Sequence, residues 1–211
     1  MLKGNGKKGL HHSKLGIRYS ILNRHFVSTL LVLIFLFAGC SAAQHTYRKP
    51  SDHWATSNHL NDAVYSEKVS ALQDDLTDLN RQANKLEARQ VAETAITYSS
   101  YLAEVYELVR PAVLHNVLVR MSIKERGLCY HWTEDLMKQL KSLDLKTYQL
   151  HWAVAYRGSE LREHNTVVVT TGSEAFASGM VLDPWRNSGD LYWALVKADT
   201  YPWEQLPPDE W

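Results

Sequence analysis

The apolar residues of this 211-residue chain change their spacing near residue 145. Before that point they recur every three or four positions, which is the period of one face of an α-helix. After it, short runs rich in Val, Thr, Tyr and Trp alternate in the manner of β-strands. We expect strands at 148–156, 165–171 and 179–183, and "DLYWALV" reads as a strand or a short helix. Helices followed by an apparently antiparallel sheet predict an α+β fold in one domain of about 150 residues, enough to bury a core.

An apolar stripe at steps of four and three residues predicts one helix over Leu72–Leu86. We expect it to lie on the domain or to pair with its neighbour, and a short stalk that binds a second copy or another partner is the alternative. The next helix is expected over Ala92–Val109 and ends by Pro111, because proline removes a helix hydrogen bond and clashes with the preceding turn. Further helices are expected at 112–123 and at 129–142.

The first 39 residues resemble an export signal. Six basic residues and no acidic one accompany the apolar run "FVSTLLVLIFLFAGC", whose uncharged core is shorter than the about 20 residues of a membrane span. The ending Ala-Gly-Cys resembles the lipobox of bacterial lipoproteins, where the cysteine receives lipid (palmitate among its acyl groups) and becomes the N-terminus. The resemblance implies a signal peptide over 1–39, lipid on Cys40 and a tether over 40–58. Ser41 implies the periplasmic face of the outer membrane in the bacterial envelope. An uncleaved N-terminal anchor is the alternative.

The charge of the chain depends on that leader. The whole sequence has 23 basic and 23 acidic residues, and removal of the leader's six basic residues leaves 17 basic and 23 acidic, a net charge of −6. Nucleic-acid binding needs basic surface to meet phosphate. An acidic exported domain is therefore not expected to bind nucleic acid.

Cys129 follows a glycine at the expected start of a helix, in "RGLCYHWTEDLMKQL". If Cys40 carries lipid, Cys129 has no partner cysteine, although the compartment favours disulfides. Such a thiol is either reactive or a buried, inert small residue. At a helix N-terminus the unpaired N–H groups and the dipole stabilise both a thiolate and an oxyanion.

His164 and Asp183 are the polar residues that best complement Cys129. His164 begins one expected strand and Asp183 ends the next, and neighbouring antiparallel strands bring such residues side by side. A nucleophile, a base and a carboxylate that orients the base suit covalent acyl transfer. His131 lies about 200° around the helix from Cys129 and is not expected to serve it. His151, within the first strand, is a weaker candidate base.

The segments "GLCYHWTEDL", "EHNTVVV" and "VLDPW", in that order, resemble the transglutaminase-like branch of the papain-like cysteine enzymes. That family has a Gly-x-Cys at a helix start, a His that begins a strand and an Asp on the next strand. The resemblance covers about residues 124–193 and implies a papain-like cysteine proteinase fold. It assigns Cys129 as nucleophile, His164 as base and acid, and Asp183 as orienter. The core then occupies 123–211, after a helical segment at 59–122.

Two positions depart from the family pattern. Asn165 follows His164, where many members have a small residue and then Trp. No glutamine stands just upstream of Cys129 to resemble the oxyanion donor of the papain branch. The second oxyanion donor is therefore unassigned.

Trp132 and Trp185 are the candidate substrate-binding side chains, whereas Trp152 and Trp193 are expected to pack in the core. Arg186 can hold a substrate carboxylate or lie solvated on the surface. Neither C-x-x-C nor H-E-x-x-H occurs, so no metal is expected.

These features predict an envelope-anchored cysteine hydrolase, a peptidase or amidase that forms a thioester on Cys129. The expected partners are a peptide or protein amide substrate and, through the lipid, the membrane. No cofactor is expected. The alternative from another class is a catalytically inactive lipoprotein that serves as an interaction or structural module.

Overall fold

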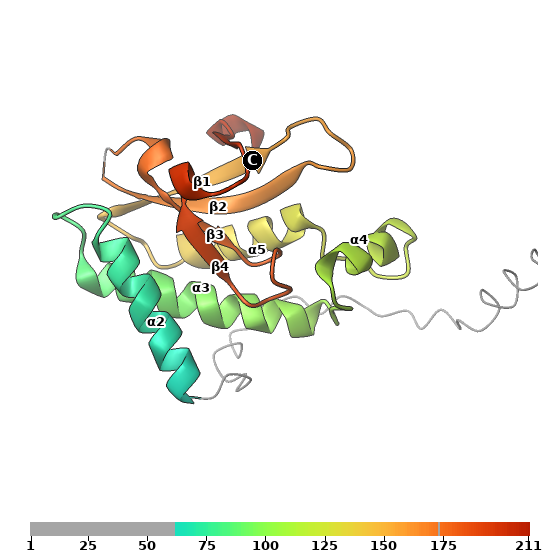
Figure 1. Cartoon of the computed structure of the whole chain (residues 1–211), viewed down its shortest axis with the longest axis horizontal. Helices are drawn as coiled ribbons and strands as arrows, with labels where there is room; N and C mark the ends of the chain where they lie inside the picture. The colour runs from blue at the N-terminus through green and yellow to red at the C-terminus, as the bar shows by residue number, and fades with distance from the viewer. Residues whose placement is uncertain (1–61, 173) are drawn as a thin grey trace, which may run out of the picture. The chain divides into compact units, whose positions relative to one another are not determined.

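The computed structural model describes residues 62–172 and 174–211, so the predictions for the leader, Cys40 and the tether lie outside the described residues. Figure 1 shows helices gathered on one side of a β-sheet. The α-helices are α2 (Asp62–Thr77), α3 (Lys85–Val105), α4 (Ala112–Arg120) and α5 (Cys129–Lys141). The strands are β1 (Tyr148–Ala155), β2 (His164–Thr171), β3 (Met180–Asp183), β4 (Tyr192–Leu195) and β5 (Trp203–Gln205). Short 3-10 helices are η2 (Phe176–Ser178), η3 (Val196–Ala198) and η4 (Pro208–Glu210).

The apolar stripe Leu72–Leu86 is divided between two helices, so the prediction of one helix across it is wrong. The side chain of Asn84 accepts hydrogen bonds from the N–H groups of Leu86 (2.9 Å) and Glu87 (3.2 Å). This is an N-cap, which starts a new helix, α3, within the stripe. The chain reverses between α2 and α3, and the two helices pack against each other.

The leucines of the stripe pack mainly against the protein's own core. Leu72 and Leu76 are fully buried in the core, whereas the Leu86 side chain is 75% exposed. A partner contact through this stretch stays a prediction, and Leu86 is the leucine of the stripe with surface to offer such a partner.

The remaining helices overlap their expected ranges to different degrees. α3 (Lys85–Val105) is shifted toward the N-terminus from the expected Ala92–Val109. α4 begins directly after Pro111 and ends at Arg120, before the expected residue 123, and α5 differs from its expected range by one residue at its end. Within residues 62–172 and 174–211, no helix has the length and apolar character that crossing a membrane requires.

Five strands form one antiparallel sheet in the order β4-β3-β2-β1-β5, which confirms the α+β class. β1, β2 and β3 agree with the expected strands to within one residue at each end. The segment "DLYWALV" supplies β4 and then the turn η3. β5, at the edge beside β1, was not predicted, because three residues are too few to show alternation.

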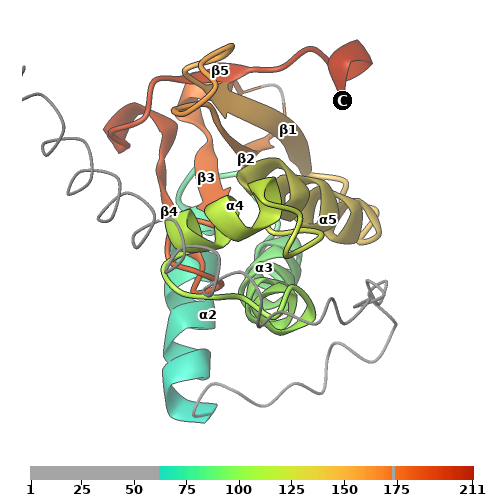
Figure 2. The same ribbon diagram turned by 90° about the vertical axis from the view of Figure 1, so that its right-hand side faces the viewer.

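The helices cover one face of the sheet in successive layers. α5 packs on β1 and β2, α3 packs on α5, and α2 packs on α3, as Figures 1 and 2 show. Leu136 and Leu140 of α5 and Val167 of β2 are fully buried in this main core. A smaller cluster that includes Val168 and Trp203 lies on the other face. The start of α5 and the start of β2 are therefore held together by the packing behind them.

The two ends of the leucine stripe test this arrangement. Leu72→Ala removes a fully buried side chain and is expected to lower the free energy of unfolding by about 2–5 kcal/mol. Leu86→Ala, at an exposed position of the same stripe, is the matched control and should change it by less than about 0.5 kcal/mol. Urea unfolding followed by circular dichroism measures both. Equal effects at the two positions would contradict the division of the stripe.

Candidate active site

The turn before Cys129 depends on Gly127. Its φ of +124° lies in the region that side chains rarely adopt, and an added Cβ would lie 2.3 Å from Nε2 of His115. The carbonyl oxygen of Gly127 accepts a hydrogen bond of 2.9 Å from Nε1 of Trp132 in the next turn of α5. Cys129 thus becomes the first residue of α5, where the N–H groups have no intrahelical acceptor.

His131 holds the same turn and does not face the thiol. Its Nδ1 accepts hydrogen bonds from the N–H groups of Gly127 (3.1 Å) and Leu128 (3.2 Å). Only an unprotonated Nδ1 can accept them. Burial, reinforced by the charge of Arg126, lowers the pKa of His131 to about 4, so this nitrogen stays an acceptor at neutral pH.

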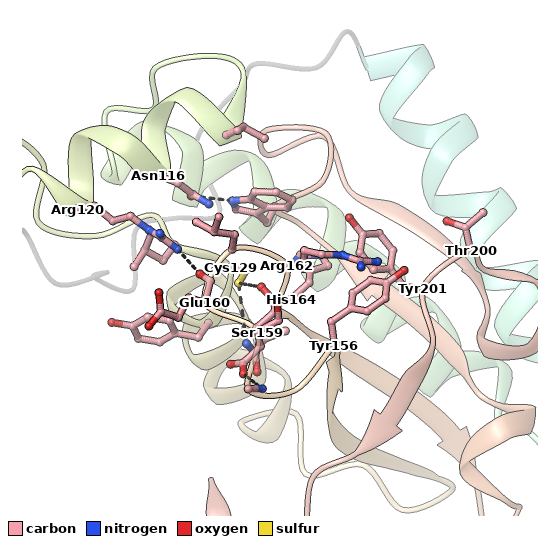
Figure 3. Close-up of a pocket in the computed structure, with 18 residues that line it drawn as sticks. Asn116, Arg120, Cys129, Tyr156, Ser159, Glu160, Arg162, His164, Thr200 and Tyr201 are labelled. Carbon is pink, nitrogen blue, oxygen red and sulfur yellow. Dashed lines mark hydrogen bonds between the residues drawn. The ribbon is translucent and has the colours of Figure 1, made fainter.

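Cys129 is partly exposed and lies beside the start of β2. Its Sγ lies 3.8 Å from the carbonyl oxygen of Glu163 and 3.9 Å from Nδ2 of Asn165. Both contacts are long, so the sulfur is weakly held and remains open to a substrate. Figure 3 shows it among the side chains that line a cavity.

His164, the first residue of β2, is buried and is oriented by Asp183. Its Nε2 lies 2.7 Å from Oδ2 of Asp183 at the end of β3. Its Nδ1 is also buried and makes no hydrogen bond within the described residues. Although no hydrogen-bond geometry joins Nδ1 to Cys129, the thiol is close enough for its interaction with the ring to raise the pKa of His164. The structure therefore brings Cys129, His164 and Asp183 together.

The charge state of His164 follows from these neighbours. Burial on its own lowers the pKa of His164, but the charge and hydrogen bond of Asp183, together with the interaction with Cys129, outweigh it and raise the pKa to about 9. The ring is therefore an imidazolium at neutral pH. Because this pKa exceeds the ordinary 6.5, the stabilisation from the charged ring is complete below pH 6.5 and is lost as the pH rises through 9.

Asp183 is fully buried, and its carboxylate is saturated with donors. Oδ1 accepts from the N–H groups of Trp185 and Arg186, each at 3.1 Å. Oδ2 accepts from Nε of Arg186 at 3.0 Å and faces Nε2 of His164. Four donors fix the carboxylate, which in turn fixes the imidazole ring.

Arg186 forms salt bridges with two carboxylates of the protein itself. Its two Nη atoms donate to the two oxygens of Asp199 at 2.9 and 2.8 Å, and Nε donates to Asp183. Burial lowers the pKa of Arg186, but these hydrogen bonds and charges outweigh it and hold the pKa above its ordinary value. Burial alone would raise the pKa of Asp199, but the hydrogen bonds from Arg186 and Trp203 outweigh it and lower this pKa to about 2. Arg186 is therefore neither a solvated surface residue nor free for a substrate carboxylate.

Three aromatic rings surround the imidazole of His164. The ring centroids of Trp185, Tyr201 and Trp203 lie 4.7, 5.0 and 5.4 Å from that of His164. They shield the His164–Asp183 pair from water, which strengthens its electrostatic interaction.

Of the two tryptophans expected to bind substrate, only Trp185 reaches the cavity. Its Nε1 donates to Oδ1 of Asn116 in α4 at 3.1 Å, and its ring is partly exposed. Trp132 is fully buried, packed edge-on against Tyr106 with its Nε1 bonded to Gly127. The expectation that Trp132 lines a substrate groove is therefore wrong, because its position on α5 faces the core.

A cavity of about 790 Å³ opens over Cys129. α4 forms one wall, and the loop between β1 and β2 forms another, as Figure 3 shows. The two walls are joined where Nη2 of Arg120 donates to the carbonyl oxygen of Glu160 at 2.8 Å. Its lining comprises Val113, Asn116, Arg120, Leu128, Cys129, Tyr130, Tyr156, Gly158, Ser159, Glu160, Leu161, Arg162, Glu163, His164, Asn165, Trp185, Thr200 and Tyr201.

The other candidates from the sequence lie apart from this site. His151 bonds Oγ1 of Thr170 through Nε2 at 2.8 Å and lines a separate hollow. In the part of the chain that the structure describes, no three His, Cys, Asp or Glu side chains form a group that could hold a metal ion.

Sequence reasoning missed Asp199, Tyr201 and Trp203. They follow β4 in a segment without strong periodicity, and only the three-dimensional return of the chain to His164 shows their role. Asn165 was noticed as a departure from a family pattern, without a function.

Comparison with known proteins gives no relative for this site. The chain matches no protein-family model, no curated protein and no solved structure.

Removal of the Asp183 carboxylate should lower the pKa of His164. In Asp183→Asn the carboxylate charge that opposes burial is gone and only the interaction with Cys129 still raises the pKa of His164, so this pKa is expected to fall from about 9. An NMR titration of histidine ring signals measures it. His151, whose pKa burial lowers and which lies outside the site, is the internal control and should titrate unchanged. A His164 signal that still titrates near pH 9 in the variant would contradict the assigned pairing.

Proposed function

We propose that this protein is an envelope-anchored cysteine hydrolase of the transglutaminase-like type, which cleaves an amide through a thioester on Cys129. The observation that carries the proposal is the orientation of His164. One ring nitrogen is fixed on Asp183 at 2.7 Å, and the other is buried without a hydrogen bond among the described residues, near the Cys129 thiol. A purely structural histidine would normally satisfy both nitrogens when buried.

The first half of the reaction forms the thioester. At neutral pH His164 already holds its second ring proton, and the positive charge of this imidazolium stabilises the thiolate on Cys129. The sulfur then forms a bond to the carbonyl carbon, and the C–N bond of the amide breaks as the leaving nitrogen receives the proton from His164. Asp183 keeps the ring oriented and stabilises its charged form throughout.

The second half releases the acyl group. Water attacks the thioester carbon while His164 takes its proton, and the C–S bond breaks to give a carboxylic acid and the thiolate. An amine in place of water would give transamidation. Hydrolysis is the proposed outcome because water needs no second binding site.

The cavity favours a peptide or protein amide as substrate. It is bounded by α4 and by the β1–β2 loop, which meet at the Arg120–Glu160 hydrogen bond, and it opens over Cys129, which suits the binding of a peptide segment there. Val113 of α4 and Leu161 of the facing loop are 63% and 84% exposed, so the rims offer apolar contact to substrate side chains. Trp185 lines the cavity beside His164 and is the aromatic residue proposed to contact the substrate.

The location of the protein is a proposal that rests on the leader. The lipobox-like Ala-Gly-Cys40-Ser supports a lipid anchor and a place in the bacterial envelope. The rival function, an inactive interaction module, would keep the same fold and leave Cys129 without chemistry.

Alkylation of Cys129 tests the proposed Cys–His pair. At pH 6.5 an ordinary thiol of pKa about 8.5 is about 1% ionised, so loss of the pair should slow iodoacetamide by about tenfold or more in His164→Ala. The rate is measured on the full-length protein by mass spectrometry of the peptide that contains Cys129, because Cys40 also reacts in any chain that lacks the proposed lipid. An acyl adduct on Cys129, trapped after reaction with an activated ester, should appear in the wild type.

Two comparisons make that test specific. Cys129→Ala should abolish the adduct while leaving any reaction at Cys40 unchanged. His151→Ala, at a partly buried histidine outside the cavity, should alkylate at the wild-type rate. A slow wild-type rate that His164→Ala does not change would favour the interaction module.

A further inference from the structure

Asn165, like His164, lies at the start of β2 beside Cys129. The two residues are consecutive in β2, so their side chains leave the strand on opposite faces. His164 contacts Trp203, which belongs to the cluster on the outer face of the sheet. Asn165 contacts Trp152, which packs against the main core on the helix face. The thiol lies at the end of the sheet, within reach of both.

The hydrogen bond from Trp152 fixes which end of the Asn165 amide faces the thiol. An indole N–H can only donate, so the atom 2.8 Å from Nε1 of Trp152 must be the oxygen Oδ1. The NH₂ group then points to Cys129, with Nδ2 3.9 Å from Sγ. Asn165 is 8% exposed, so water competes little for this donor.

We propose that Asn165 is a catalytic residue, whose Nδ2–H donates to the oxyanion formed when Cys129 attacks a carbonyl group. The backbone N–H of Cys129, at the first position of α5, is the other donor. The inference rests on the proposed function and names a group that the family resemblance leaves unassigned. It gives the residue that departs from the family pattern a role in this chain.

The oxyanion forms and collapses in two stages. The thiolate sulfur forms a bond to the carbonyl carbon, and the C=O π pair moves to the oxygen, which becomes an oxyanion. Nδ2–H of Asn165 and N–H of Cys129 donate hydrogen bonds to it without transferring a proton. When the oxyanion collapses, the pair returns to re-form C=O and the C–N bond breaks, with the leaving nitrogen protonated by His164.

The length of the contact fits a transition-state role better than a ground-state one. At 3.9 Å the amide holds the sulfur only weakly. An oxyanion donor needs about 2.7–3.1 Å to an oxygen that exists only after the sulfur has attacked. The space between Nδ2 and Sγ is where an oxygen on the attacked carbon can lie.

The test separates chemistry that forms an oxyanion from chemistry that does not. p-Nitrophenyl acetate acylates the thiol through an oxyanion, whereas iodoacetamide alkylates it by direct displacement. In full-length Asn165→Ala the acylation rate of Cys129 should fall by on the order of 100-fold, while the alkylation rate changes by less than about threefold. Asn187→Ala, at an exposed asparagine in the turn after β3, is the matched control and should keep both rates.

Each other result has a defined meaning. Equal acylation rates in Asn165→Ala and wild type would overturn the inference. A parallel loss of acylation and alkylation would also overturn it, because Asn165 would then act on the reactivity of the thiol and not on the oxyanion. A wild type that alkylates rapidly and never acylates would overturn the proposed function itself. If Asn165→Ala does not fold, Trp152→Phe decides, because it keeps the amide and removes its anchor. That variant should lose about tenfold in acylation, and an unchanged rate would overturn the inference.

Discussion

The site depends on one buried carboxylate. Asp183 accepts two backbone N–H groups from the turn after β3, the Nε of Arg186, and the bond that orients His164. A buried charge is stable only when it is paired and hydrogen-bonded, so these four contacts cannot be removed independently. They also couple three features that the proposed function requires: the tilt of the imidazole, its positive charge and the path of the chain around Trp185.

Arg186 extends this coupling to the end of the chain. It lies between Asp183 and Asp199, with its guanidinium 3.9 Å from the ring centre of Tyr192. Asp199 in turn accepts from Nε1 of Trp203 in β5. The short edge strand is thereby tied to the His164–Asp183 pair, although the sequence of the strand does not indicate this contact. The aromatic enclosure of His164 is thus built from two segments that the sheet brings to one face.

The sequence was sufficient where a residue's own neighbours determine its structure. Alternation predicted β1, β2 and β3, and the Gly-x-Cys spacing predicted the start of α5. It was insufficient where distant contacts decide. The Leu72–Leu86 stripe keeps its period across the cap at Asn84, so periodicity alone could not locate the break. The burial of Trp132 and the pairing of Arg186 depend on elements that pack from elsewhere in the chain.

The position of His164 and Asn165 on one strand restricts how this protein can vary. Because successive residues face opposite sides, a single-residue insertion or deletion that shifts β2 against β1 and β3 would exchange the two faces at once. The imidazole would then turn toward Trp152 and the amide toward Trp203. The pairing of Ala155 with His164 is therefore the register contact on which the proposed chemistry depends.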